Sequence, residues 1–233
     1  NILGGGLSEY LVIPAWQIIR MPHDVGMRHA ALTEPLACCI HSIRKARLKF
    51  GDTVVIIGMG IMGYFHVKLA QMCGARIIVS ETDEEKRKTA IREGAAYAFD
   101  PRQCDVGEEI RRLTDGLGAD AVINTIPFKE VWQQAIDMLA PYGRLIAYSS
   151  QNSKEPIGVD FGMVHSREIE FIGTLNPTIE DNQMAVKLIG YQMIDMEKVI
   201  DREFSFAQGK EAFDYACKPG VYRVMINYGK EDN

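Results

Sequence analysis

The chain has 233 residues, of which 47% are hydrophobic and 24% are charged, and its formal net charge is −5. This acidic balance gives no general reason to expect a nucleic-acid partner. No apolar run approaches the roughly 18 residues that a membrane-spanning helix needs, so no membrane partner is predicted either.

The first fifty residues predict one strand and one broken helix. The stretch "LSEYLVIP" (residues 7–14) is typical of a short strand that ends at Pro14. The stretch "MRHAALTEPLACCIHSIRKARL" predicts a helix that is interrupted at Pro35 and resumes to about Leu48. A proline biases the residue before it away from helical geometry, so we expect Glu34 to lie at this break.

From Gly51 onward the pattern changes to alternating strands and helices. "TVVIIG" (53–58) is a continuous apolar run, as expected of a strand buried on both faces. The helix after it places Phe65, Leu69 and Met72 on one side at spacings of four and three. The alternation then continues through "RIIVSE", the charged helix "DEEKRKTAIREG", "AYAFD", "VGEEIRRLTDG", "ADAVINTI", "FKEVWQQAIDMLAPYG", "RLIAYSS" and the strand "EIEFIGTL".

This alternation predicts an α/β fold with a doubly wound parallel sheet over residues 37–175. The rest of the chain does not continue the rhythm. It predicts a helix in "TIEDNQMAVKLIGYQMI", a short strand in "REFSF", a helix in "GKEAFDYACK" and a final strand in "YRVMINYG". Residues 1–36 and 176–233 are therefore predicted to be two parts of a second domain.

A glycine-rich turn joins the first buried strand of this region to its helix. In a G-x-G-x-x-G turn, the first glycine permits a tight bend, the second lets a diphosphate approach, and the third lets helix and strand pack closely. Gly58, Gly60 and Gly63 stand at these positions, and Glu81 ends the next strand, where an acid can hydrogen-bond an adenosine ribose. The sequence thus predicts a dinucleotide site.

Two other interpretations of this turn stay open. The glycines could serve packing alone, with Glu81 a solvated strand end, or the turn could bind S-adenosylmethionine, which uses a similar turn and acid. For a dinucleotide, a carboxylate at position 81 would repel a 2′-phosphate, so NAD is favoured over NADP. Lys86 and Arg87 follow closely in the sequence and could soften this preference.

The five cysteines are an odd number without paired spacing, and the chain contains no C-x-x-C. This pattern fits a reducing cytoplasm better than a disulfide framework, and it shows no self-contained zinc lobe. We therefore predict a cytoplasmic protein. The opening stretch "NILGGGLSEY" lacks the basic and apolar regions of a signal peptide.

Five motifs in one order resemble the medium-chain dehydrogenase/reductase family, above all its zinc-dependent alcohol, polyol and threonine dehydrogenases. They are "GGGLSEYLVIP", "ALTEPLACCIHS", "GDTVVIIGMGIMG", "ARIIVSETDEEKR" and "KEAFDYACKPGVYRVMINYG". The resemblance spans essentially the whole chain. It implies a Rossmann-type NAD domain with parts of a GroES-like catalytic domain, and a hydride transfer from an alcohol or polyol to NAD assisted by zinc.

The resemblance also implies roles for individual residues. Gly58, Gly60 and Gly63 match the diphosphate turn, with the N–H groups of Ile61 and Met62 facing the diphosphate. The remaining matches are Glu81 on the ribose, Lys86 on the adenosine ribose, Arg223 on the diphosphate and Glu34 beside the catalytic zinc, as ligand or as holder of its water.

The chain departs from the family at its start. The resemblance places roughly one hundred or more residues before "GGGLSEY", including the cysteine and the His-Glu pair that bind catalytic zinc. Three protein ligands are typical of such a zinc, and this sequence offers at most Glu34. We therefore expect the chain to be the C-terminal portion of a dehydrogenase, able to bind nucleotide but catalytically incomplete.

Two other classes remain alternatives: a zinc-independent quinone or enoyl reductase of the same superfamily, against which Glu34 in "TEPL" argues, and a nucleotide-binding module without enzymatic activity. Family resemblance further implies a homodimer or homotetramer. The apolar strand "EIEFIGTL" is the expected contact, because it would otherwise be an exposed sheet edge.

Overall fold

A computed structural model describes residues 6–8 and 10–229 of the chain. Contacts divide it into two compact units. Residues 38–176 form the larger unit, and the described residues among 1–37 and 177–233 form the smaller one. That the smaller unit is part of a catalytic domain stays a prediction. No helix in the described part of the chain combines the length and the apolar character needed to cross a membrane.

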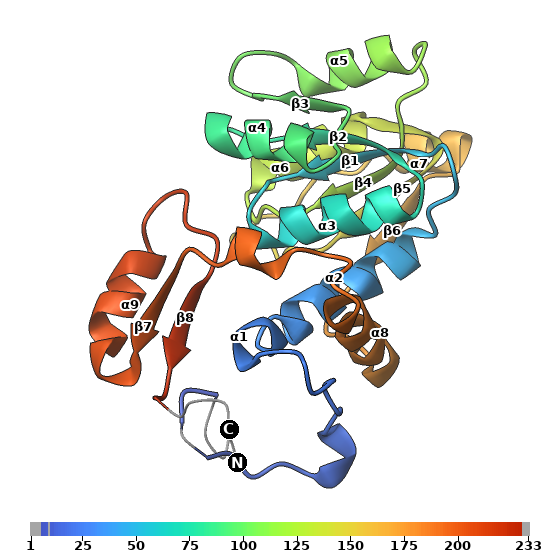
Figure 1. The fold of residues 1–233 in the computed structure, drawn as a ribbon. Coiled ribbons are helices and arrows are strands. Elements are labelled where there is room, and N and C mark those ends of the chain that lie inside the picture. The colour runs from blue at the N-terminus through green and yellow to red at the C-terminus, as the bar shows by residue number, and fades with distance from the viewer. Residues whose placement is uncertain (1–5, 9, 230–233) are drawn as a thin grey trace. The chain divides into compact units, whose positions relative to one another are not determined.

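The larger unit is a parallel six-stranded sheet in the order β3-β2-β1-β4-β5-β6, with helices between the strands (Figure 1). Its strands are β1 (Thr53–Ile57), β2 (Arg76–Ser80), β3 (Tyr97–Phe99), β4 (Ala119–Asn124), β5 (Leu139–Ala147) and β6 (Glu170–Gly173). Its helices are the greater part of α2 (Thr33–Ala46), then α3 (Ile61–Met72), α4 (Glu84–Arg92), α5 (Val106–Leu113), α6 (Lys129–Asp137) and α7 (Phe161–Arg167). The doubly wound sheet predicted from the sequence is confirmed.

Both faces of this sheet are covered, which explains the unbroken apolar runs of its central strands. All five residues of β1 are buried. Side chains alternate between the faces of a strand. Val55 and Ile57 on one face pack with Ile110 of α5 and Trp132 of α6, whereas Ile56 on the other face lies beneath the first turn of α3. Strands buried on both faces are the usual state of a parallel sheet.

The smaller unit contains a two-stranded parallel sheet, formed by β7 (Arg202–Ser205) and β8 (Val224–Asn227). Its helices are α1 (Met27–Ala30), α8 (Ile179–Gly190) and α9 (Gly209–Ala216), with three short 3₁₀ helices, η1 (Ala15–Gln17), η2 (Met196–Val199) and η3 (Phe206–Gln208). Segments from the two ends of the chain meet here: the imidazole of His29 lies 2.6 Å from Glu197 Oε1, and Arg28 forms an ion pair with the same carboxylate at 3.0 Å.

The predicted strand at residues 7–14 is wrong. The residues of this stretch that the structure describes form no strand, and Glu9 lies outside the described residues. Tyr10 and Val12 are 78% and 90% exposed. Side chains alone do not make a strand, because its backbone N–H and C=O groups need a neighbouring strand as partner. The described part of the chain places no such neighbour beside this stretch.

The predicted helix break at Pro35 is also wrong. The chain turns at residues 31–32, and α2 then runs without interruption through Glu34 and Pro35 to Ala46. Pro35 stands in the first turn of this helix, where an N–H group would have no intrahelical acceptor, so a proline there removes no hydrogen bond. Glu34 is consequently helical rather than at a break.

Two smaller differences concern the end of the sheet. Helix α6 ends at Asp137 and β5 begins at Leu139, so strand geometry starts before the predicted "RLIAYSS". Helix α7 was not predicted. Its signal is Asp160, whose side chain accepts hydrogen bonds from the N–H groups of Gly162 and Met163 as an N-cap.

Candidate functional site: the glycine turn between β1 and α3

The first glycine of the turn is fixed by its backbone and by its neighbours. Gly58 follows β1 with φ at +93°, a region that strains any residue with a side chain. A Cβ atom there would lie 2.6 Å from Thr125 Oγ1 and 2.7 Å from the Ile126 Cδ1 atom. The tight bend after β1 therefore requires glycine at this position.

The third glycine sets how closely α3 lies against the end of β1. A Cβ atom on Gly63 would be 2.0 Å from the carbonyl oxygen of Gly58 and 2.8 Å from the carbonyl carbon. These are backbone atoms, which cannot rotate away as a flexible side chain can. Gly63 thus permits the close approach of helix and strand that brings the start of α3 to the turn.

The second glycine faces open space. A Cβ atom on Gly60 would meet nothing within 4 Å in the described part of the chain, its own chain neighbours aside. Gly60 is the N-cap of α3, which has no side-chain cap and no acidic residue in its first turn. Its carbonyl accepts from Tyr64 N at 2.9 Å, as the first intrahelical bond does.

The N–H groups of Ile61, Met62 and Gly63 precede that bond, and such amides have no acceptor inside their own helix. Together with the positive end of the helix dipole they suit an anion. By contrast, the neighbouring helices α4 and α5 are closed by the side chains of Asp83 and Asp105. The start of α3 therefore combines donors, positive potential and room.

The turn lies where the strand order of the sheet reverses. The chain leaves β1 toward β2 on one side, while β4 pairs with β1 on the other. Thr125, directly after β4, donates from Oγ1 to the carbonyl of Ile57 at 2.7 Å and so ties the two strand ends together. In open α/β sheets, ligands bind outside the carboxyl ends of the strands at this switch point.

Glu81 is brought beside the turn and held there by hydrogen bonds. It follows β2, and its Oε2 accepts from the N–H of Met59, inside the turn, at 2.6 Å. Its Oε1 accepts from Asp83 N at 2.8 Å and from Thr82 Oγ1 at 3.1 Å. The carboxylate is half-buried and oriented by three donors, so the structure unites the predicted glycines and the predicted acid in one place.

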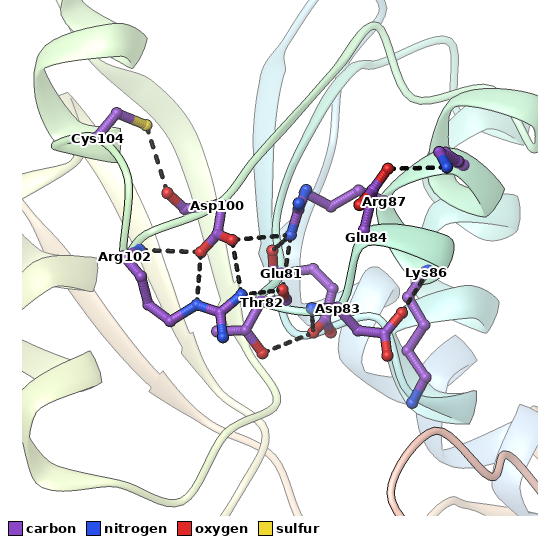
Figure 2. Close-up of polar contacts among 10 residues, drawn as sticks. Glu81, Thr82, Asp83, Glu84, Lys86, Arg87, Asp100, Arg102 and Cys104 are labelled. Atoms are coloured by element: carbon purple, nitrogen blue, oxygen red, sulfur yellow. Dashed lines mark hydrogen bonds and ion pairs between the residues drawn. The ribbon is translucent and has the colours of Figure 1, made fainter.

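Two arginines and a buried aspartate support the loop that follows Glu81 (Figure 2). Asp100 accepts from Arg102 Nε at 2.9 Å and Nη2 at 2.7 Å, and from Arg87 Nη1 at 3.2 Å. The Arg102 guanidinium, with Arg87 beside it, holds the pKa of the Asp100 carboxyl well below its usual range. Asp100 is therefore ionised over the whole physiological range of pH.

Asp100, Arg102 and Thr125 were not found from the sequence. The available signal was position: Asp100 follows β3 and Thr125 follows β4, and the carboxyl ends of parallel strands meet at one edge of a sheet. Lys86 lies in the first turn of α4, where its N–H donates to Asp83 Oδ1 at 2.9 Å. The structure gives no test of the ribose contact predicted for its side chain.

The other two predicted residues belong to the smaller unit. Arg223 precedes β8, donates from its N–H to Asp201 Oδ2 at 3.1 Å, and has a buried Nε without a hydrogen-bond partner. Glu34 is exposed in the first turn of α2. Among the described residues, no three His, Cys, Asp or Glu side chains are grouped so that they could hold a metal ion. The roles of Arg223 and Glu34 stay predictions.

Comparison with known proteins gives a consistent result. The sequence pattern of a family described as zinc-binding dehydrogenase matches residues 61–190, which is more than half of the chain. A D-arabitol-phosphate dehydrogenase from Enterococcus avium is 26% identical over 98% of this chain and 65% of its own length. A sorbitol dehydrogenase from Halalkalibacterium halodurans is 28% identical over 97% of this chain and 66% of its own.

A solved structure shares the fold closely. A zinc-binding dehydrogenase from Sinorhizobium meliloti 1021, bound to NADP, superposes with a TM-score of 0.89 at 28% identity over 95% of this chain. The match covers 66% of that protein. The chain thus spans just under two thirds of the length of these relatives.

Proposed function

The chain belongs to the zinc-binding dehydrogenase family, and from this premise we propose that its larger unit binds a nicotinamide dinucleotide at the glycine turn. The observation that carries the proposal is the open space at Gly60 beside the uncapped start of α3. In this arrangement the backbone comes close to a diphosphate, which accepts hydrogen bonds from the amides of Ile61, Met62 and Gly63.

The same proposal assigns the adenosine ribose to Glu81. Its carboxylate lies next to the turn through the bond to Met59 N, so a nucleotide with its diphosphate on α3 extends its ribose toward it. Lys86 on the ribose and Arg223 on the diphosphate complete the set by family resemblance.

We propose that NAD is preferred over NADP. One relative of known structure holds NADP, so family membership leaves the choice to local chemistry. Here a carboxylate occupies the place where a 2′-phosphate would lie, and like charges repel. The two nearby arginines are engaged with Asp100 and with backbone carbonyls.

Calorimetric titration of the chain with NADH and with NADPH tests both statements. We expect NADH to bind at least about tenfold tighter, which corresponds to about 1.4 kcal/mol. Comparable dissociation constants would contradict the role of Glu81. Absence of binding by either nucleotide would contradict the proposed function as a whole.

For the protein as a whole we propose the oxidation of a small alcohol or polyol with transfer of hydride to NAD, as the names of its relatives suggest. Zinc does not fit the described residues, because no three His, Cys, Asp or Glu side chains among them are grouped to hold a metal ion, and a catalytic zinc typically has three protein ligands. NADH formation with a panel of polyols, with metal analysis of the same preparation, tests this proposal.

We further propose a cytoplasmic homo-oligomer that pairs through β6. This strand is an edge of the sheet, and Phe171 within it and Leu175 after it are exposed. An apolar sheet edge is a template for pairing with another chain. Light scattering that finds only monomers at micromolar concentration would contradict this assembly.

A further inference from the structure

We propose that Asp100 is a positioning residue that sets the coenzyme preference, because it holds Arg87 and Arg102 against the backbone and withholds both guanidinium groups from a 2′-phosphate. The inference rests on the proposed nucleotide function of the glycine turn. It assigns to an aspartate after β3 a part of the specificity that would otherwise be attributed to Glu81 alone.

The first observation is the burial and geometry of Asp100. Its side chain is only 3% exposed, although it is charged. Arg102 forms a bidentate pair with this carboxylate: its Nε donates to Oδ1 at 2.9 Å and its Nη2 donates to Oδ2 at 2.7 Å. Burial of an unpaired carboxylate costs free energy, and a bidentate pair with arginine is among the strongest hydrogen-bonded partners that it can have.

The second observation is where the rest of each arginine points. Arg87 Nη1 donates to the carbonyl oxygens of Glu81 at 2.9 Å and Thr82 at 2.7 Å, and Arg102 Nη2 donates to the same Thr82 carbonyl. Figure 2 shows Asp100 between the two guanidinium groups, with the backbone of residues 81–83 beside them. Asp100, Arg87 and Arg102 thus form a hydrogen-bonded clamp on the loop that carries Glu81, and Asp100 is the residue that joins the two arginines.

These bonds link the carboxyl ends of three neighbouring strands. Asp100 follows β3, and the N–H of Glu81, after β2, donates to the carbonyl of Phe99 at 3.0 Å. The Glu81 carboxylate then reaches Met59 N after β1. A change at Asp100 is therefore transmitted to the position of Glu81 through a chain of hydrogen bonds.

The third step concerns charge. NADP enzymes of this fold accommodate the 2′-phosphate with an arginine, because the planar guanidinium group forms bidentate hydrogen bonds with phosphate. Arg102 is 65% exposed, and its hydrogen bond to Asp100 raises its pKa, with smaller contributions from the nearby carboxylates of Glu81 and Asp83. Loss of the Asp100 charge leaves both guanidinium groups held only by the carbonyls of Glu81 and Thr82, so they are freer to turn toward a phosphate at the ribose site.

The test is the affinity ratio in Asp100→Asn, which keeps the shape of the side chain and removes its charge. We expect the ratio of the NADPH to the NADH dissociation constant to fall by about tenfold or more, since a released arginine can form a charge-assisted pair with the phosphate. Adding Arg102→Gln to this variant is expected to restore much of the original ratio. Asp105→Asn is the matched control, because Asp105 caps α5 in the same way that Asp83 caps α4 and asparagine also caps well.

An Asp100→Asn protein that binds NADH with an unchanged ratio would overturn the inference and leave the proposed function standing. Wild-type chain that binds neither nucleotide would overturn both. Glu81→Gln supplies an independent test that does not require a change at Asp100. With Asp100 in place, loss of the Glu81 charge removes a repulsion but releases no arginine, so NADPH affinity is expected to rise by less than about tenfold, and a larger rise would show that the arginines are already available.

Discussion

The two units of this chain differ in how their sequence encodes them. In the larger unit, β1 is buried at all five positions and pairs with β2, which lies one helix further along the chain. In the smaller unit, contacts join segments that lie far apart in the sequence, as in the pair of His29 and Glu197. The hydrophobic pattern of a sequence indicates burial within a local segment. It therefore predicts the larger unit far better than the smaller one.

The same difference between the two units explains why one strand prediction was right and another was wrong. Val55 and Val12 both stand in apolar, β-branched runs, yet Val55 is fully buried and Val12 is 90% exposed. What separates them is the presence of a neighbouring strand, which a run of apolar letters does not reveal. The comparison predicts that substitutions in the two units have very different costs.

The largest effect is expected at Gly63. Gly63→Ala places a Cβ atom 2.0 Å from the Gly58 carbonyl oxygen. Because both partners are held by the close packing of α3 on β1, the backbone must shift, and we expect the free energy of unfolding to fall by about 3 kcal/mol. Chemical denaturation measures this. A loss below about 1 kcal/mol would show that the turn is not rigid.

A second large effect concerns pH. His66 is fully buried between Ser42 Oγ at 2.9 Å and the Met62 carbonyl at 2.7 Å, and burial lowers its pKa to about 4. The unfolded chain takes up this proton near pH 6.5. Stability is therefore complete above pH 6.5 and declines between about 6.5 and 4, by about 3 kcal/mol in total.

The His66 prediction is checked by the difference in unfolding free energy between wild type and His66→Gln from pH 7.5 to 4.5. The difference should shrink as the pH falls, because only the wild type has a proton to gain at this position on unfolding. A difference that stays constant over this range would mean that His66 titrates alike in both states.

Most of the larger unit could be predicted, because each of its signals is local. The apolar run, the three glycines and Glu81 lie within one strand-helix-strand unit, so one rule of spacing relates them. The hydrogen bonds of Asp100 with Arg87 and Arg102 could not be predicted, since Arg87 lies 13 positions before Asp100 and no spacing rule links them. The prediction at Pro35 was wrong because proline breaks a helix in its interior but is tolerated in its first turn, and the sequence alone did not show where the helix begins.

The smallest effect is expected for Val12. We predict that Val12→Ala changes the unfolding free energy of this chain by less than about 0.5 kcal/mol. Val55→Ala removes the same two methyl groups from the buried β1 and is expected to cost about 2 kcal/mol. Thermal or chemical denaturation of the pair gives the contrast. Equal costs would contradict the description of residues 10–14 as exposed.

The central claim is that the glycine turn binds a dinucleotide through the backbone at Gly60. The most direct measurement is NADH titration of Gly60→Ala, with circular dichroism of the same sample. Because the added methyl group meets no atom of the described residues within 4 Å apart from its neighbours in the chain, we predict a native spectrum and a dissociation constant raised by about tenfold or more. A native spectrum with unchanged NADH affinity would contradict the account.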